Sequence, residues 1–291
     1  MATDHSAPIQ PLMKDRLTAQ SWIAVTIIIF LTLHVFTAAV PASTVAAALE
    51  GPHVLYLVAK AYGSIAALQV NQKLIAYPQI PEAFPEVFDE TAIYVMPDRF
   101  RADLVTETRQ HIYLEVGDRS LTLMDGRLVE EPLPFLNYQR VLRSRTQPQL
   151  MRTLNQMGVE TAISSLGRVA ETVVYVLGAR YPDESVTQLA IDKQTFLPLR
   201  LLLVGGEPGT GNRRQEIFFY NWQKVQSGWF PFQIVFFLNG RLVREIRVAN
   251  LRLNPSIPAD VLDLEALKAS AALKPGDPAA QGVENVQQKV E

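Results

Sequence analysis

Residues 217–240 read IFFYNWQKVQSGWFPFQIVFFLNG and hold nine of the 25 aromatic residues of this 291-residue chain. Large side chains alternate on both sides of Ser227 and Gly228, which is typical of two strands joined by a turn. The even positions predict one uniformly apolar face, made of Phe218, Tyr220, Trp222, Phe230, Phe232, Ile234, Phe236 and Leu238. Each large ring hides roughly 150 to 250 Å² when buried, so this face requires a cover.

Four structures could use such a face: a packed core, the wall of an apolar cavity, a membrane strand or a base-stacking platform. Close cover would give the core and loose cover the cavity, and both remain open. A membrane barrel is disfavoured because the strand-like run 168–176 carries charge in both registers. Base stacking is disfavoured because only Lys224 lies between the rings.

The flanking sequence predicts an α+β fold that is mainly antiparallel β. Apolar residues from Pro52 to Gln69 have helical spacing. From Val70 onward the period is two, and turn signals such as Asp125-Gly126 and Asn239-Gly240 separate about ten or eleven strands. Neither a linker nor a repeat interrupts them, so we expect one domain.

A helical insertion, Leu133 to Gly158, interrupts the strands. We expect it to act as a lid whose apolar side chains are Phe135, Leu136, Tyr138, Leu142, Leu150 and Leu154. The same segment carries four arginines, which are Arg140, Arg143, Arg145 and Arg152. These arginines suit either an anionic headgroup or a solvated helix face, and the sequence does not choose between them.

The first 48 residues are interpreted as an export element. Trp22 to Val40 contains no charged residue, and the small residues after it suit a signal peptidase. Cleavage is the preferred interpretation, and an uncleaved inner-membrane anchor is the alternative because 19 residues can span a bilayer. Either way the domain, residues 49–265, is expected in the periplasm. Residues 266–291 are expected to form a flexible tail.

Composition excludes several functions. A net charge of −2 gives no footprint for nucleic acid, and the absence of cysteine excludes disulfides, thiol catalysis and an acylated cysteine. His53 and His111 are the only histidines of the domain and are interpreted as surface or helix-end residues. The glycine-rich segment Gly205 to Arg214 lacks the Lys-Ser/Thr pair of a phosphate loop. We therefore expect no catalytic residue, no metal and no cofactor.

Several stretches together resemble the periplasmic lipoprotein carriers of the LolA/LolB type and the wider superfamily of outer-membrane lipoprotein-sorting proteins. They are AIYVMPDRFRADL (92–104), LTLMDGRLVEEP (121–132), IDKQTFLPLRL (191–201), YNWQKVQSGWFPFQI (220–234) and LRLNPSIPADVLDL (251–264). Two departures stand out. Met96 precedes Pro97 where the carrier has an arginine that latches the lid, and the missing cysteine argues against the lipid-anchored receptor.

The resemblance implies a curved, incomplete barrel, covered by helices, that receives acyl chains in the apolar space between them. It implies a periplasmic, non-enzymatic protein that binds lipid or acylated lipoprotein, acts as a carrier in envelope trafficking and has envelope proteins as further partners. The alternative is a membrane-tethered interaction or sensor module with a closed core and no ligand. An enzyme built on this scaffold is the least favoured interpretation, since the domain has few histidines and no cysteine.

Overall fold

The structure is a computed structural model that describes residues 48–80, 82–106, 109–129, 136–205 and 213–272. The chain divides into two compact units, Met1–Ala47 and Ala48–Glu291, and the fold described below is that of the second. The proposed export element, including Trp22 to Val40, therefore lies outside the described residues. Within the described ranges, no helix is long and apolar enough to cross a membrane.

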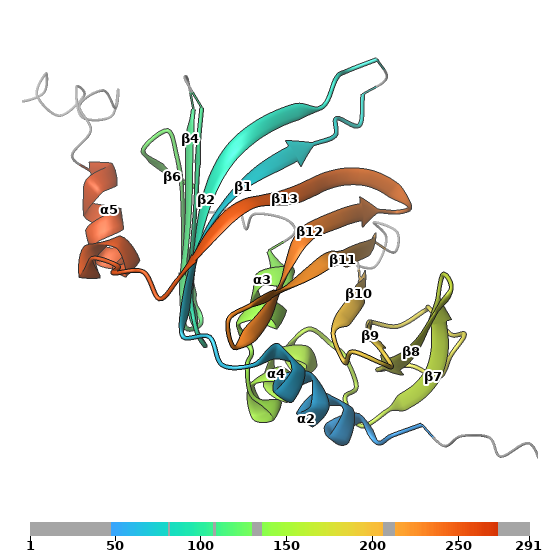
Figure 1. Ribbon diagram of the computed structural model, residues 1–291. Coiled ribbons are helices and arrows are strands. Elements are labelled where there is room, and N and C mark those ends of the chain that lie inside the picture. Colours follow the sequence, from blue (N-terminus) through green and yellow to red (C-terminus); the bar gives the residue numbers. More distant parts are fainter. Residues whose placement is uncertain (1–47, 81, 107–108, 130–135, 206–212, 273–291) are drawn as a thin grey trace, which may run out of the picture. The chain divides into compact units, whose positions relative to one another are not determined.

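One antiparallel sheet of 13 strands dominates the second unit (Figure 1). Its strands are β1 (Ala67–Ala76), β2 (Glu86–Val95), β3 (Arg99–Val105), β4 (Gln110–Val116), β5 (Arg119–Met124), β6 (Arg127–Val129), β7 (Ser164–Val169), β8 (Thr172–Leu177), β9 (Gln188–Asp192), β10 (Pro198–Gly205), β11 (Arg213–Val225), β12 (Gly228–Leu238) and β13 (Arg241–Leu253). The helices are α2 (Gly51–Tyr62), α3 (Asn137–Arg143), α4 (Gln147–Gln156), the short 3₁₀ helix η1 (Ala259–Leu262) and α5 (Leu264–Ala272).

The strand order explains where the helical insertion lies. It runs β6-β5-β4-β3-β2-β1-β13-β12-β11-β10-β9-β8-β7, so the sheet is open and β6 and β7 are its two edges. The segment between β6 and β7 must connect these edges, and α3 and α4 belong to it. In Figure 1 both helices lie against the concave face of the curved sheet. The predicted α+β half-barrel with an N-terminal helix and a helical insertion is confirmed.

The N-terminal helix is shorter than predicted. It ends at Tyr62, and Gly63 follows with φ 69°. Ala67 to Gln69 belong to β1, so the helix predicted over Pro52 to Gln69 is wrong for its last seven residues. The apolar spacing misled because Ile65 and Leu68 are buried as well, although they lie beyond the helix.

The β11–β12 hairpin has a register that the sequence analysis did not foresee. Its two-residue loop is Gln226-Ser227, one position earlier than predicted, and Val225 pairs with Gly228. A two-residue loop pairs odd residues with even ones, so Phe219 lies opposite Ile234. The prediction of a single even-numbered face across both strands is therefore wrong.

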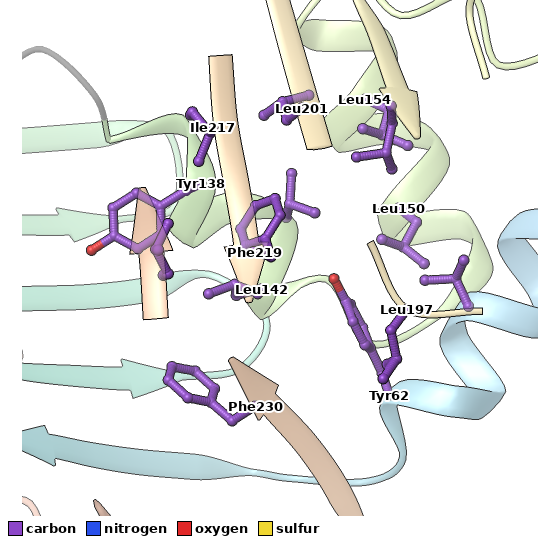
Figure 2. Packing of buried hydrophobic residues seen from close by; sticks show 14 of the residues in the cluster. Tyr62, Tyr138, Leu142, Leu150, Leu154, Leu197, Leu201, Ile217, Phe219 and Phe230 are labelled. Atoms are coloured by element: carbon purple, nitrogen blue, oxygen red, sulfur yellow. The ribbon is translucent and has the colours of Figure 1, made fainter. Parts of the chain in front are cut away.

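A single large cluster fills the space between the sheet and helices α2, α3 and α4 (Figure 2). Phe219 of β11, Tyr138 and Leu142 of α3, and Leu150 of α4 are all essentially inaccessible to solvent. Glycine at 228 permits the close contact with α2, because a Cβ there would lie 2.6 Å from the carbonyl oxygen of Tyr62. Most of the apolar core is thus formed by the lid helices against the sheet.

Helix α5 lies on the other face of the sheet. Ile112 and Leu114 of β4 pack against Leu264 and Leu267, whereas the alternate residue Glu115 contacts α3. Since successive side chains of a strand point to opposite faces, α5 covers the face opposite the lid. Residues 266–272, which were expected to begin a flexible tail, belong to this helix. The remainder of that tail, 273–291, lies outside the described residues.

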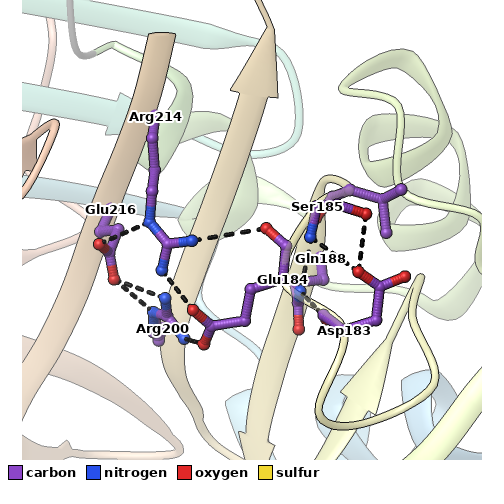
Figure 3. A network of polar contacts seen from close by, with 8 residues as sticks. Asp183, Glu184, Ser185, Gln188, Arg200, Arg214 and Glu216 are labelled. Atoms are coloured by element: carbon purple, nitrogen blue, oxygen red, sulfur yellow. Dashed lines mark hydrogen bonds and ion pairs between the residues drawn. The ribbon is translucent and has the colours of Figure 1, made fainter. Parts of the chain in front are cut away.

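Beside β10 and β11, two arginines and two glutamates form a network of ion pairs (Figure 3). Arg200 and Arg214 each contact both Glu184 and Glu216. Hydrogen bonds from Arg200 lead the interactions that lower the pKa of Glu184 to about 2. The network fastens the loop before β9 to two neighbouring strands.

Candidate functional site

The structure brings together three of the predicted cavity-wall residues, but as part of a packed core. Phe230, Ile234 and Phe236 of β12 are buried, and all three belong to the cluster between sheet and lid. The ring centroids of Phe236 and Tyr138 lie 5.4 Å apart in an edge-on arrangement. The sheet and α3 are thus in direct contact at this position.

Other predicted wall residues lie elsewhere. Phe218 stacks on Tyr220 with ring centroids 5.8 Å apart, and these two rings alternate with the buried Ile217 and Phe219. They therefore lie on the opposite face of β11, where 44% of Tyr220 is exposed. Phe218 and Tyr220 are not part of the concave face, contrary to the prediction.

The last two predicted wall residues, Trp222 and Phe232, lie near the irregular position Asn221 of the hairpin. Asn221 adopts a left-handed conformation, φ 51°, and the alternation shifts by one residue there. Trp222 therefore reaches the core, where its ring centroid is 5.8 Å from that of Tyr62 and its indole N–H donates to the Pro198 carbonyl oxygen. Phe232 is only partly buried, and it is not among the residues of the core cluster.

The predicted lid residues behave more uniformly. Tyr138, Leu142, Leu150 and Leu154 are all buried in the core cluster, and Leu136 packs against it. Phe135 lies outside the described residues. Thr146 begins α4 with a capping box in which its side chain accepts from the Gln149 N–H. The insertion is therefore a well-formed helical pair that faces the sheet.

An apolar cavity of about 290 Å³ lies farther along the same face of the sheet, next to Leu136 at the start of α3. Its wall consists of Leu74, Ala76, Phe88, Glu90, Ala102, Leu104, Arg109, His111, Tyr113, Leu136, Val243 and Arg244. On β1 to β4 these are alternate residues, two on each strand, as one face of a sheet requires. The cavity approaches the lower size limit of small-molecule sites, which is roughly 300 Å³.

A bulge in β13 shapes one side of this cavity. Phe236 pairs with Arg244 and Phe237 pairs with Leu242, so Val243 is the extra residue. A bulge bends its strand and interrupts the alternation of side chains. For this reason two successive residues, Val243 and Arg244, line the same cavity.

The floor of the cavity carries buried polar groups. Glu90 accepts a very short hydrogen bond from the Gln72 amide, and its carboxylate is 3.7 Å from the Arg244 guanidinium. Arg244 also lies over the Phe236 ring, 5.3 Å from its centroid. Within the described residues, the buried Nε of Arg244 has no hydrogen-bond partner. Arg244 therefore keeps one N–H donor that the described residues leave unsatisfied.

Glu115 of β4 attaches α3 to the sheet. Its carboxylate accepts hydrogen bonds from Tyr113, Gln139, Arg140 and Arg143, at 2.5 to 3.0 Å. Burial disfavours the charged carboxylate, but Arg143, Tyr113 and Arg140 outweigh it and lower the pKa of Glu115. Charge-assisted bonds of this kind, away from water, hold α3 firmly in place.

Arg145, in the turn between α3 and α4, forms no ion pair with a carboxylate of the described residues. Its guanidinium donates to the carbonyl oxygens of Tyr62 and Trp229 and lies 4.8 Å from the Tyr62 ring centroid. Burial, only partly offset by Tyr62, lowers its pKa to about 10. Because Arg143 is buried and Arg145 is half-buried with its Nε and Nη2 inaccessible to solvent, the interpretation of the arginines as a solvated helix face is wrong for these two.

The sequence analysis missed most of the cavity wall. It treated His111 as a surface residue, but His111 is partly buried and lines the cavity. Alternation along β3 and β4 would have placed Leu104 and Tyr113 on the lid face. The bulge at Val243 and the pairing of β1 with β13 could not have been read from alternation.

The fold and this site can now be compared with known proteins. An outer-membrane lipoprotein-sorting protein domain from Vibrio parahaemolyticus superposes with a TM-score of 0.51 at 10% sequence identity, covering 75% of this chain and 98% of that one. A LolA-superfamily protein from Nitrosomonas europaea gives a TM-score of 0.49 at 13% identity, covering 75% of this chain and 99% of that one. The sequence matches no protein-family model and no curated protein.

The first of these structural similarities defines the class of fold. The chain has a LolA-like fold, which it shares with this lipoprotein-sorting protein domain and which its sequence resemblance implies. At 10% identity the similarity concerns the fold, while function depends on the site that this fold carries.

Proposed function

We propose that this protein is a non-enzymatic, periplasmic protein that binds lipid or acylated lipoprotein and holds an acyl chain in the apolar cavity beside Leu136. The observation that carries the proposal is the cavity itself, which lies between the concave sheet and the start of the lid in a LolA-like fold. Transfer of hydrocarbon from water to such a site is favourable by roughly 0.8 kcal/mol per CH₂ group. The LolA-like fold also supports the proposal that this protein is located in the cell envelope.

The lid is the proposed movable part. Lifting α3 would separate Tyr138 from Phe236 and extend the cavity toward Phe230 and Trp222, so that the rings packed in the core become the wall of a larger site. The Glu115 contacts would oppose this opening. In this proposal the Glu115 contacts latch the lid. In the family that the sequence resembles, an arginine at the position of Met96 has this function. Release would then require a membrane or partner that accepts the chain.

Arg244 suits the polar end of an acyl chain. Its buried Nε could donate to the carbonyl oxygen of an ester, amide or carboxyl group at the cavity floor, beside Glu90. The nearby aliphatic residues would then contact the hydrocarbon. This arrangement resembles other ligand pockets, where a few polar groups orient a mostly apolar ligand.

The experiment compares two tryptophan variants of the full chain. Purified protein is examined by native mass spectrometry for co-purified lipid and is then titrated with a fluorescent fatty acid. Ala76→Trp fills the cavity and should reduce uptake at least about tenfold, a loss of about 1.4 kcal/mol of binding. The control, Val87→Trp, places the same ring on the neighbouring strand at a residue that is 59% exposed, and it should bind like the wild type.

A closed interaction or sensor module is the second candidate function. The packing of Tyr138 on Phe236 favours it, because the core beneath α3 is filled where a wide cavity was predicted. A wild-type protein that carries no lipid and takes up no fatty acid would reject the lipid-binding proposal and leave this module as the better account. Envelope proteins would then be its partners.

A further inference from the structure

A second cavity, of about 340 Å³, lies at the other end of α3 and is polar. Residues from three regions line it: α3 and the following turn, α4, and the ends of β3 and β4 where they meet turns. Arg140, Arg143 and Arg152 supply three guanidinium groups. The Ser144 hydroxyl, also in the lining, donates to the Arg140 carbonyl oxygen and is hydrogen-bonded to the Thr153 hydroxyl. Three cationic groups from one helical pair therefore share a single cavity.

Arg143 is unusual among these groups. Its side chain is only 3% exposed and Nη2 donates to Glu115, yet within the described residues the buried Nε and Nη1 have no partner. Leaving a buried donor without an acceptor costs about 1 to 3 kcal/mol, and more for a charged group. A buried arginine with two free nitrogens beside a cavity is what an anion site requires before its ligand arrives.

Three arginines and three carboxylates line the cavity, and they differ in position. Glu115 contacts both the buried Arg143 and Arg140, whose side chain is 40% exposed, so it neutralises only one of these two guanidinium groups. Arg152 is exposed and adds a further positive charge. Asp98 and Asp118 also line the cavity, but both are exposed to water, where solvent weakens their effect.

The two cavities are neighbours along β4. Tyr113 lines the apolar cavity and donates to Glu115, 2.7 Å away, which lines the polar one. The start of α3 borders the first cavity through Leu136, and its end borders the second through Arg143. An amphiphile with one acyl chain and a phosphate group would match this arrangement of apolar and polar space.

We propose that the polar cavity binds a phosphate group, held by the guanidinium groups of Arg143, Arg140 and Arg152. Guanidinium groups match the geometry of phosphate oxygens and bind them through charge-assisted hydrogen bonds. The phosphate is either free or part of a lipid headgroup, and the experiment below distinguishes these two sources. The headgroup form rests on the acyl-chain function proposed above, whereas the free form does not.

The test uses three probes with the full chain. Lysophosphatidylglycerol and a monoacylglycerol with the same acyl chain are compared by displacement of a fluorescent fatty acid, and glycerol 3-phosphate is titrated alone by NMR of the arginine Nε–H groups. Lysophosphatidylglycerol should bind at least about tenfold more tightly, which one net charge-assisted hydrogen bond can supply. Arg152→Gln should reduce this preference about threefold or more without changing monoacylglycerol binding. Arg168→Gln, which removes an exposed arginine on β7, should change neither.

Each outcome distinguishes the two proposals. Equal binding of both lipids, or equal effects of the two arginine variants, would overturn the headgroup form of the site and leave the acyl-chain function intact. Binding of glycerol 3-phosphate without binding of either lipid would support the phosphate site and reject acyl-chain binding. If glycerol 3-phosphate shifts no arginine signal and the lipids bind equally well, the phosphate proposal is wrong for both sources.

Discussion

At the scale of single residues, small and polar side chains decide how closely the elements approach one another. Gly228 lets β12 meet the end of α2, and Asn221 takes the left-handed conformation that brings Trp222 into the core. Both residues lie within the aromatic hairpin, yet neither is aromatic. The rings supply the buried area, but these two residues determine which rings are buried.

Substitution of Gly228 tests this statement. Gly228→Ala should destabilise the protein by roughly 1 to 3 kcal/mol, because the new Cβ would lie 2.6 Å from the Tyr62 oxygen and from the Ile65 side chain. Gly205→Ala is the matched control, since a Cβ there meets none of the described residues within 4 Å, and it should change stability by at most about 0.5 kcal/mol. Urea unfolding of both variants gives the comparison. Equal stability of the two variants would show that the chain near Tyr62 and Ile65 can move away from the new Cβ at little cost in free energy.

At the scale of elements, α3 is held by apolar contacts on one side and by Glu115 on the other. Tyr138 and Leu142 are buried in the core, and Arg140 and Arg143 bind the carboxylate. Seven residues are too few for a helix that is stable by itself in water. The helix therefore depends on these tertiary contacts, and a change at Glu115 should act on α3 before it acts on the sheet.

Glu115→Gln should accordingly loosen α3. The variant leaves the buried Arg143 without a charged partner, and loss of one member of a buried ion pair costs about 3 kcal/mol. Hydrogen exchange measured by mass spectrometry should show faster exchange in α3 than in β12. Glu86→Gln, a change at an exposed position of β2, serves as the control. Unchanged exchange in α3 would mean that apolar packing alone holds the helix.

At the scale of the whole molecule, paired carboxylates couple stability to pH. Hydrogen bonds from Arg200 lead the interactions that lower the pKa of Glu184, and those from Arg247, Gln233 and Tyr77 outweigh burial at Glu245 and lower its pKa as well. A carboxylate in the unfolded chain has a pKa near 4.3. Since the folded values are lower, ionisation favours the folded state above the unfolded pKa, and this contribution is lost as the pH falls.

The urea midpoint should therefore vary little from about pH 7 to pH 5 and decrease below about pH 4.5. For Glu184, whose folded pKa is about 2, the loss should continue to about pH 2. Glu184→Gln should lower the midpoint at pH 7 and flatten its decrease between pH 5 and pH 3. Glu160→Gln, at an exposed residue, should keep the wild-type profile. If both variants follow the wild-type curve, the network at Arg200 and Arg214 does not contribute to stability.

The sequence by itself determined the fold class, the helical insertion and several of the turns, because alternation and turn chemistry are local properties. The Asp125-Gly126 and Asn239-Gly240 turns lie where they were predicted. Only the tertiary structure decided which rings face the lid, since the odd-to-even pairing of the hairpin and the bulge at Val243 depend on contacts between strands. It also decided the cavity and the environment of the arginines. Arg143 and Arg145 contact segments distant in sequence, β4 and the end of α2, and no local sequence pattern predicts where those segments lie.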